Sequence, residues 1–119
     1  MSCPCGAGVA LGACCGRFLD AGQRPETAEQ LMRSRYSAYV LKRALYLRES
    51  WHPRTRPKML DLDGAHWLGL SVLAAADQDA DHATVEFVAR YRDRSGAHEL
   101  REHSRFERWR GAWVYVDAL

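Results

Sequence analysis

The hydrophobic positions in residues 27–53 repeat at the spacing of a helix. Thr27 and Gln30 form a capping-box pattern just after Pro25, which marks a helix start. The apolar side chains then recur every three or four residues: Met32, Tyr36, Val40, Ala44, Leu47 and Trp51. Four more residues widen this stripe: Ser34, Ala38, Leu41 and Leu45. We therefore expect one long helix, covered on more than one side, that ends near Pro53.

Four segments after residue 64 alternate between apolar and polar positions, as strands do. Leu68, Leu70 and Val72 fall on one face of the first. The predicted strands cover residues 67–72, 85–92, 98–109 and 113–117, with turns at 77–81, 95–96 and 110–111. One long helix followed by four antiparallel strands predicts an α+β fold in which a bent sheet wraps around a helix.

The composition narrows the class of protein. With 119 residues, 47% hydrophobic and 27% charged, the chain suits one folded domain. No stretch approaches the roughly 18 consecutive apolar residues of a spanning helix, so we expect no membrane segment. The net charge of +2 lacks the strong basic excess typical of nucleic-acid binders, and we do not expect nucleic acid as a partner.

All four cysteines lie in the first fifteen residues, as Cys3, Cys5, Cys14 and Cys15. This clustering cannot staple the rest of the chain, and cysteines this close in sequence suit relaxed disulfides poorly. Zinc, in contrast, takes four thiolates tetrahedrally at about 2.3 Å, and a closed site of this kind is structural. We predict a structural Zn²⁺ held by the four cysteines. Reduced reactive thiols and disulfides are the alternatives.

The segment from Leu11 to Cys14 has the pattern of a bacterial lipoprotein cleavage site. A secretory signal, however, needs a positively charged start and an uninterrupted apolar core. The first basic residue is Arg17, and Pro4 and Gly6 interrupt any apolar run. We therefore expect no lipidation and a cytoplasmic location.

Several motifs resemble a known family. Cys3-Pro4-Cys5-Gly6 and Cys14-Cys15-Gly16 resemble the SEC-C motif, a short zinc-binding segment. The stretch from Leu31 to Val40 is similar to the helix signature of the uncharacterised YchJ-like bacterial proteins. Further similarity lies at residues 51–53, 67–70, 87–91, 104–106 and 113–117. The resemblance covers nearly the whole chain in the family's order.

This resemblance implies two parts: a SEC-C-like zinc-binding segment over residues 1–22 and a nuclear transport factor 2-like (NTF2-like) domain over residues 23–119. The expected domain is cone-shaped, with a long helix packed in a curved antiparallel sheet. The metal ligands carried over by position are Cys3, Cys5, Cys14 and Cys15. Two departures stand out: Ala7 replaces the usual serine, and the sequence ends at Leu119 without the second SEC-C segment that many relatives have.

A curved sheet over a helix encloses a pocket that polar and aromatic side chains can line. The candidate pocket residues are Tyr36, Tyr39, Trp51, His52, Trp67, Glu86, Arg90, His103 and Arg105. A base at Glu86 or His103, beside a tyrosine donor, would suit proton transfer on a small ligand. The alternative, which we favour, treats Glu86, Arg90 and Arg105 as members of cross-strand ion pairs and His52 as a helix terminator.

The acidic segment Asp77-x-Asp79-x-Asp81 resembles the opening of a calcium-binding loop. The sixth position of such a loop requires glycine and is His82 here, and the twelfth requires glutamate and is Val88. We therefore predict a solvated turn.

Taken together, these features favour a zinc-stabilised binding or adaptor domain. Because SEC-C segments elsewhere act as recognition modules, the resemblance implies a protein partner at the zinc segment. A homodimer through the open sheet face is a second expectation, since related folds commonly dimerise. The alternative function is a small-molecule enzyme of the isomerase, dehydratase or hydrolase type.

Overall fold

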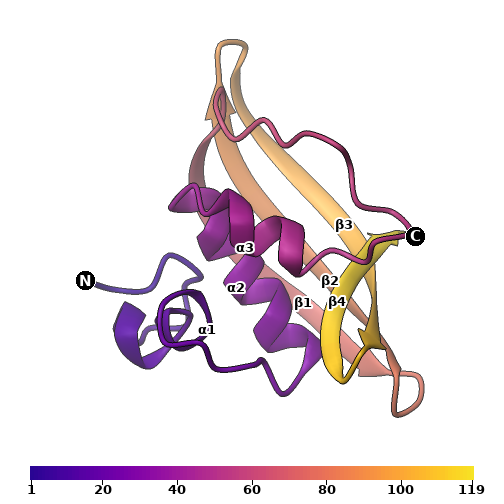
Figure 1. Ribbon diagram of the computed structural model, residues 1–119. Coiled ribbons are helices and arrows are strands. Elements are labelled where there is room, and N and C mark those ends of the chain that lie inside the picture. The colour runs from indigo at the N-terminus through magenta and orange to yellow at the C-terminus, as the bar shows by residue number, and fades with distance from the viewer.

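The computed structural model describes residues 1–119. The helical elements are the 3-10 helix η1 (Leu11–Ala13) and the α-helices α1 (Gly16–Leu19), α2 (Ala28–Val40) and α3 (Ala44–Glu49). The strands are β1 (His66–Asp77), β2 (His82–Asp93), β3 (Gly96–Trp109) and β4 (Ala112–Ala118). They form one antiparallel sheet in the order β1-β2-β3-β4. Helices α2 and α3 lie against one face of the curved sheet (Figure 1), which confirms the α+β fold.

Helix α2 begins at the predicted capping box. The amide of Gln30 donates to Oγ1 of Thr27 at 3.1 Å, and its side-chain oxygen accepts from the amide of Glu26 at 2.8 Å. These bonds satisfy amides that the first turn of a helix leaves free. The local sequence therefore fixes where α2 starts.

The prediction of one helix reaching Pro53 is wrong, because the chain breaks between α2 and α3. Lys42 adopts the left-handed conformation with φ of 58°. The amide of Arg43 then donates to the carbonyl of Ala38 at 2.8 Å, as in a Schellman motif. This motif ends α2, and α3 starts in a new direction.

The face of β1 also differs from the prediction. The β1–β2 register shifts between Trp67 and Gly69, which makes Leu68 a bulged residue that is 49% exposed. Trp67 and Leu70 thereby pack on the same side, towards the helices. A second shift farther along β1 adds to the bend of the strand. The sequence-based prediction assumed strict alternation along the strand and therefore placed Leu68 on the same face as Leu70.

The three strand connections lie where the turns were predicted, at residues 78–81, 94–95 and 110–111. Arg110 and Gly111 have φ values of 53° and 79°, the positive values that a two-residue type I′ hairpin requires. None of the helices combines the length and apolar character that crossing a membrane requires.

Two groups of buried side chains make up the core. The larger one fills the space between α2 and the sheet and contains Ala28, Leu31, Met32, Ala83, Val85, Phe106 and Trp113. The second joins the N-terminal segment to α2 and β2 through Cys3, Cys5, Cys15, Tyr36 and Ala89. The cysteines are therefore part of the packed interior.

Candidate functional site

The first nineteen residues fold so that the two cysteine pairs face each other. The amide of Cys3 donates to the carbonyl of Val9 at 2.9 Å, which closes a loop containing Cys5. Gly6 and Gly8 in that loop have φ of 80° and 81°, which side chains other than glycine rarely adopt. The second pair, Cys14 and Cys15, connects η1 to α1.

The four sulfur atoms form one compact cluster. All lie within 4.8 Å of one another, and Sγ of Cys5 is 3.6 Å from Sγ of Cys14. No pair forms a disulfide. A tetrahedron with metal–sulfur bonds of about 2.3 Å has edges of about 3.8 Å, whereas a disulfide bond is about 2.05 Å long. The spacing therefore suits a four-coordinate metal ion.

The thiols perturb one another strongly. The Cys15 thiol donates a hydrogen bond that lowers the pKa of Cys5 to about 4. Burial and the neighbouring sulfurs raise the pKa of Cys14 to about 11, and the bond to Cys5 together with burial also raises the pKa of Cys15. In the metal-free cluster a thiolate is therefore favoured at Cys5, and the protonated thiol is favoured at Cys14 and Cys15. A divalent cation would offset the repulsion among further thiolates.

The inner side of the cluster rests on α2. Ser37 Oγ lies 3.5 Å from Sγ of Cys3, and Arg33 Nη1 donates to the carbonyl of Cys5 at 3.1 Å. Tyr36, between these two helix positions, is buried against the cysteines. One helix thus supports the cysteine-containing segment through three side chains.

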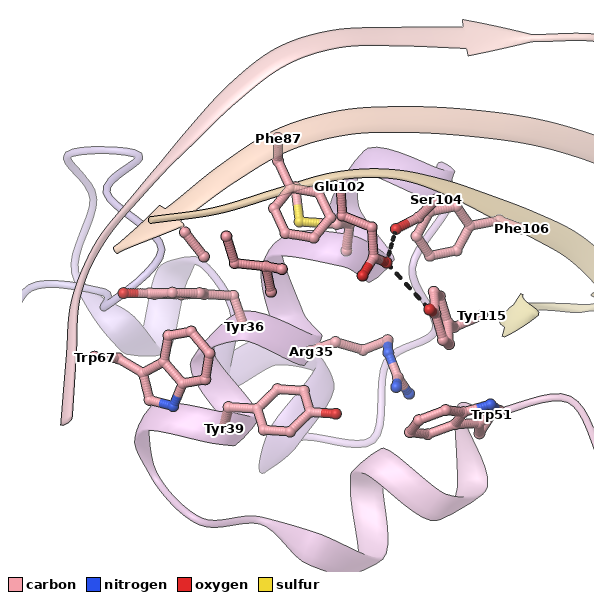
Figure 2. A pocket seen from close by; sticks show the side chains of 13 residues that line it. Arg35, Tyr36, Tyr39, Trp51, Trp67, Phe87, Glu102, Ser104, Phe106 and Tyr115 are labelled. Carbon is pink, nitrogen blue, oxygen red and sulfur yellow. Dashed lines mark hydrogen bonds between the residues drawn. The ribbon is translucent and has the colours of Figure 1, made fainter. Parts of the chain in front are cut away.

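A cavity of about 300 Å³ lies on the other side of α2, between that helix and the sheet (Figure 2). Ten of its thirteen lining residues are hydrophobic. The lining consists of Met32, Arg35, Tyr36, Tyr39, Trp51, Trp67, Phe87, Ala89, Leu100, Glu102, Ser104, Phe106 and Tyr115. Its volume is at the lower end of the range for small-molecule sites.

Arg35 is the cation of this cavity and is only 5% exposed. Its Nη1 donates to the carbonyl of Leu47 at 2.9 Å and to Oγ of Ser50 at 2.6 Å. The guanidinium carbon lies 4.8 Å from the ring centroids of both Trp51 and Tyr115. Burial lowers the pKa of Arg35, but an arginine remains charged at neutral pH. These contacts fix the charge in place.

Glu102 is the carboxylate of the cavity. Its Oε2 accepts hydrogen bonds from Oγ of Ser104 and from the hydroxyl of Tyr115, the latter at 3.1 Å. Burial and the charge of Glu102 raise the pKa of Tyr115. Tyr115 therefore connects the two charges, because its ring packs on Arg35 and its hydroxyl binds Glu102. The cavity as a whole is formally neutral.

Four of the predicted pocket residues line the cavity: Tyr36, Tyr39, Trp51 and Trp67. Glu86 and His103 do not. They are cross-strand neighbours, with Glu86 bound to Arg101 at 2.9 Å. Because Val85 and Phe87 pack inward, strand alternation directs Glu86 to the outer face. The alternative interpretation, a pocket base at Glu86 or His103, therefore does not agree with the structure, whereas the Glu86–Arg101 pair agrees with the ion-pair interpretation that we favoured.

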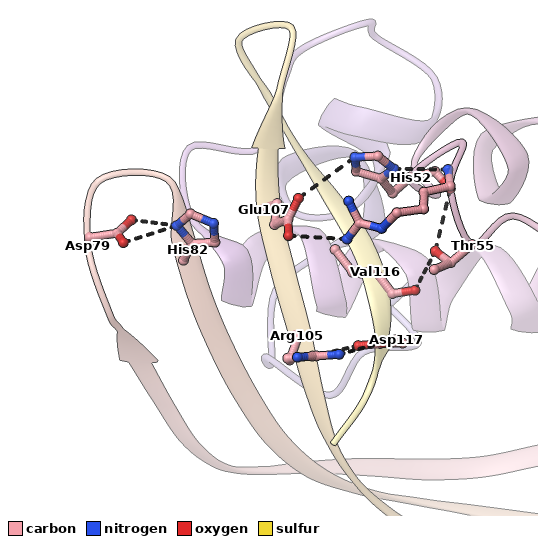
Figure 3. Close-up of polar contacts among 9 residues, drawn as sticks. His52, Thr55, Asp79, His82, Arg105, Glu107, Val116 and Asp117 are labelled. Atoms are coloured by element: carbon pink, nitrogen blue, oxygen red, sulfur yellow. Dashed lines mark hydrogen bonds and ion pairs between the residues drawn. The ribbon is translucent and has the colours of Figure 1, made fainter.

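The other three predicted residues also lie outside the cavity. The amide of His52 donates to the carbonyl of Tyr115 at 2.8 Å, which holds the chain after α3 against β4. The ring Nε2 of His52 lies 3.7 Å from the carboxylate of Glu107 (Figure 3). Arg105 pairs with Asp117 at 2.6 Å, and Arg90 lies 3.6 Å from Glu99. These contacts agree with the ion-pair interpretation of the arginines.

The sequence interpretation missed Arg35, Glu102, Ser104 and Tyr115. Two signals were available. Glu102 and Ser104 have the same strand parity as the aromatic Phe106, so they share its inward face. Arg35 lies on the helix face between Met32 and Tyr39, although a charged residue there is usually taken as exposed.

The acidic turn at residues 77–81 is exposed, and the carboxylate of Asp79 accepts hydrogen bonds from within the turn. Asp79 accepts a hydrogen bond from Nδ1 of His82 at 2.8 Å (Figure 3). It also accepts one from the amide of Asp81 at 2.8 Å. The hydrogen bonds of His82 raise its pKa, and those to Asp79 lower the pKa of that carboxyl. This is the predicted solvated turn.

Comparisons with known proteins agree with this architecture. Residues 27–118 match the family model of the YchJ middle NTF2-like domain. A UPF0225 protein of Ralstonia nicotianae is 53% identical over 98% of this chain and 89% of its own length. One from Streptomyces coelicolor is 53% identical over 97% and 92%.

Two solved structures share the fold. The solution structure of a SEC-C motif-containing protein from Rhodopseudomonas palustris has a TM-score of 0.88 at 34% identity, covering 100% of this chain and 98% of that one. The crystal structure of a SEC-C motif-containing protein from Psychrobacter arcticus has a TM-score of 0.82 at 28% identity, with coverages of 97% and 80%.

Proposed function

This chain belongs to the UPF0225 family, in which a SEC-C motif accompanies a YchJ-like NTF2-like domain, and we propose that it is a cytoplasmic small-molecule-binding protein whose cavity is supported by structural zinc. The single observation that supports this most strongly is the position of Tyr36. Tyr36 belongs to the same buried cluster as Cys3, Cys5 and Cys15, and it also lines the cavity. The metal centre and the ligand cavity thus share a wall.

The donor set favours zinc. Four thiolates around one ion form a site that zinc prefers, and a site with four protein ligands leaves no position open for a substrate. Three of the four cysteines are buried, which also fits a structural ion. In this proposal the zinc orders residues 1–22 and holds them against α2.

The cavity favours binding over catalysis. Its lining is mainly aromatic and its polar groups converge at one region, as in sites for small ligands. Glu102 beside the hydroxyl of Tyr115 makes acid–base catalysis the second candidate function. Binding is favoured because ten of the thirteen lining residues are hydrophobic and Glu102 is hydrogen-bonded to Ser104 and Tyr115 of the protein itself. The protein partner and the homodimer remain predictions of the family resemblance.

Metal analysis tests the zinc component. We expect about one zinc per chain in the purified protein, and loss of zinc in the variant Cys14→Ser. Chelation should also shift the fluorescence of the cavity tryptophans, because Trp67 packs edge-to-face on Tyr36 at 5.8 Å between ring centroids. Absence of zinc would overturn the metal proposal. Zinc loss that leaves the emission unchanged would overturn the support of the cavity by the metal centre.

A further inference from the structure

We propose that the cavity selects uncharged, flat aromatic ligands that carry a hydrogen-bond donor and an acceptor on one edge, in preference to the corresponding acids and amines. This inference rests on the proposed ligand-binding function and adds the chemical class of the ligand. It follows from the shape of the cavity, from the free polar atoms on its wall and from its charge balance.

The shape and lining of the cavity favour a ligand with a flat aromatic ring system. Seven of the lining side chains are aromatic: Tyr36, Tyr39, Trp51, Trp67, Phe87, Phe106 and Tyr115. Rings contribute stacking and edge contacts to a planar ligand. The volume of about 300 Å³ suits a molecule of one or two fused rings. Leu100 of β3 lines the cavity and is 40% exposed to solvent.

The polar atoms of the cavity that have no partner within the protein determine which hydrogen-bonding groups a ligand should carry. Within the protein, Arg35 uses Nη1 for its two hydrogen bonds, so Nε and Nη2 still have hydrogen to donate. Glu102 accepts both of its bonds at Oε2, so Oε1 has unused lone pairs. Figure 2 shows the carboxylate of Glu102 and the guanidinium of Arg35 on either side of the same space. A ligand edge with an acceptor for Arg35 and a donor for Glu102 would satisfy both.

The charge balance sets the preference for a neutral ligand. The cavity contains one cation and one carboxylate, both held by Tyr115. A ligand carboxylate that approached Arg35 would meet the like charge of Glu102, and a ligand ammonium near Glu102 would meet Arg35. Like charges in a site poor in water are strongly unfavourable, whereas a neutral amide edge pairs with both groups. The paired charges of Arg35 and Glu102 therefore disfavour both anionic and cationic analogues of the ligand.

Three probes with the same ring test the inference: indole-3-acetamide, which is neutral, indole-3-acetate, an anion, and tryptamine, a cation. Calorimetric titration of the zinc-loaded full chain should give an affinity for the amide about tenfold or more above that for either charged probe. Stronger binding of a charged probe would overturn the ligand class while leaving the binding function intact. Absence of binding by all three at millimolar concentration would overturn the binding function itself.

The variant Glu102→Gln tests the charge argument directly. It keeps the size of the side chain but leaves Arg35 as an uncompensated cation, so affinity for indole-3-acetate should rise about tenfold and the amide should lose its preference. Glu86→Gln is the matched control, because Glu86 lies on the outer face of the sheet. An unchanged ranking in Glu102→Gln would overturn the inference. If that variant does not fold, the ranking of the probes on the unaltered protein decides.

Discussion

Replacing Gly16 by alanine tests whether the second cysteine pair is held by close backbone packing. Gly16 is the first residue of α1 and directly follows Cys15. A Cβ atom at this position would lie 2.6 Å from the carbonyl oxygen and 3.1 Å from the carbonyl carbon of Leu11. Both are backbone atoms, so no side-chain rotation relieves the contact. The segment from Leu11 to Gly16 must therefore open, and it contains Cys14 and Cys15, two of the four clustered cysteines.

The expected size of the effect follows from two opposing contributions. Overpacking costs about 1–3 kcal/mol. Alanine in a helix gains back about 0.5–1 kcal/mol relative to glycine. We therefore expect Gly16→Ala to lower the free energy of unfolding by about 1–2 kcal/mol, which corresponds to a fall in Tm of about 3–8 °C for a domain of this size. Strain confined to the metal-bound form would lower the metal affinity by about tenfold.

Gly12→Ala is the matched control, because a Cβ there meets no atom within 4 Å. Urea and thermal unfolding of both variants, with and without a chelator, separate the loss of packing from the loss of metal. We expect Gly12→Ala to unfold like the unaltered protein. Equal stability of Gly16→Ala and Gly12→Ala would refute the close approach to Leu11 as the constraint on this segment.

Three further substitutions address the helix break, the buried charge and the acidic turn. Lys42→Gly should raise the free energy of unfolding by about 0.5–1 kcal/mol in urea denaturation, because glycine adopts positive φ without steric cost; a loss of stability would contradict this. Arg35→Met should lower the free energy of unfolding by about 3 kcal/mol, because it removes two buried charge-assisted hydrogen bonds, to Leu47 and Ser50. A change below about 1 kcal/mol would argue against a structural role of this buried charge. Asp79→Asn should return the raised pKa of His82 towards its ordinary value in an NMR titration. The raised pKa of His82 favours the folded state below the ordinary histidine pKa, and this contribution fades as pH rises through the folded value.

The sequence was sufficient for features set by local chemistry. The capping box at Thr27 and the hairpin turn at Arg110 follow from a few neighbouring residues, and both lie where predicted. The break at Lys42 was missed because lysine is a poor residue for the left-handed conformation and gave no stop signal. The bulge at Leu68 was missed because it depends on pairing with β2, which alternation within one strand does not reveal.

In the candidate site, too, local features could be predicted from the sequence, and features that depend on tertiary contacts could not. The clustering of the cysteines was visible because all four lie within one short segment. The cavity depends on which face of β2 and β3 turns inward. Choosing Glu86 and His103 in place of Glu102 was an error of strand parity, and a shift of one residue exchanges the two faces of a sheet. Arg35 was missed because its burial depends on two aromatic rings and a carbonyl from elements remote in sequence.

The arrangement of side chains on α2 explains why the four-cysteine cluster and the cavity are physically linked. At 3.6 residues per turn, Arg33 and Ser37 lie on the face that supports the cysteines, while Arg35 and Tyr39 lie on the face that lines the cavity. Tyr36 lies between these two faces and contacts both sites. Any rotation or shift of α2 that follows metal loss must therefore move Arg35 and Tyr36 together. If the cysteines hold zinc and the cavity holds a ligand, as we propose, zinc content and ligand affinity should change in parallel, because one helix positions the residues of both sites.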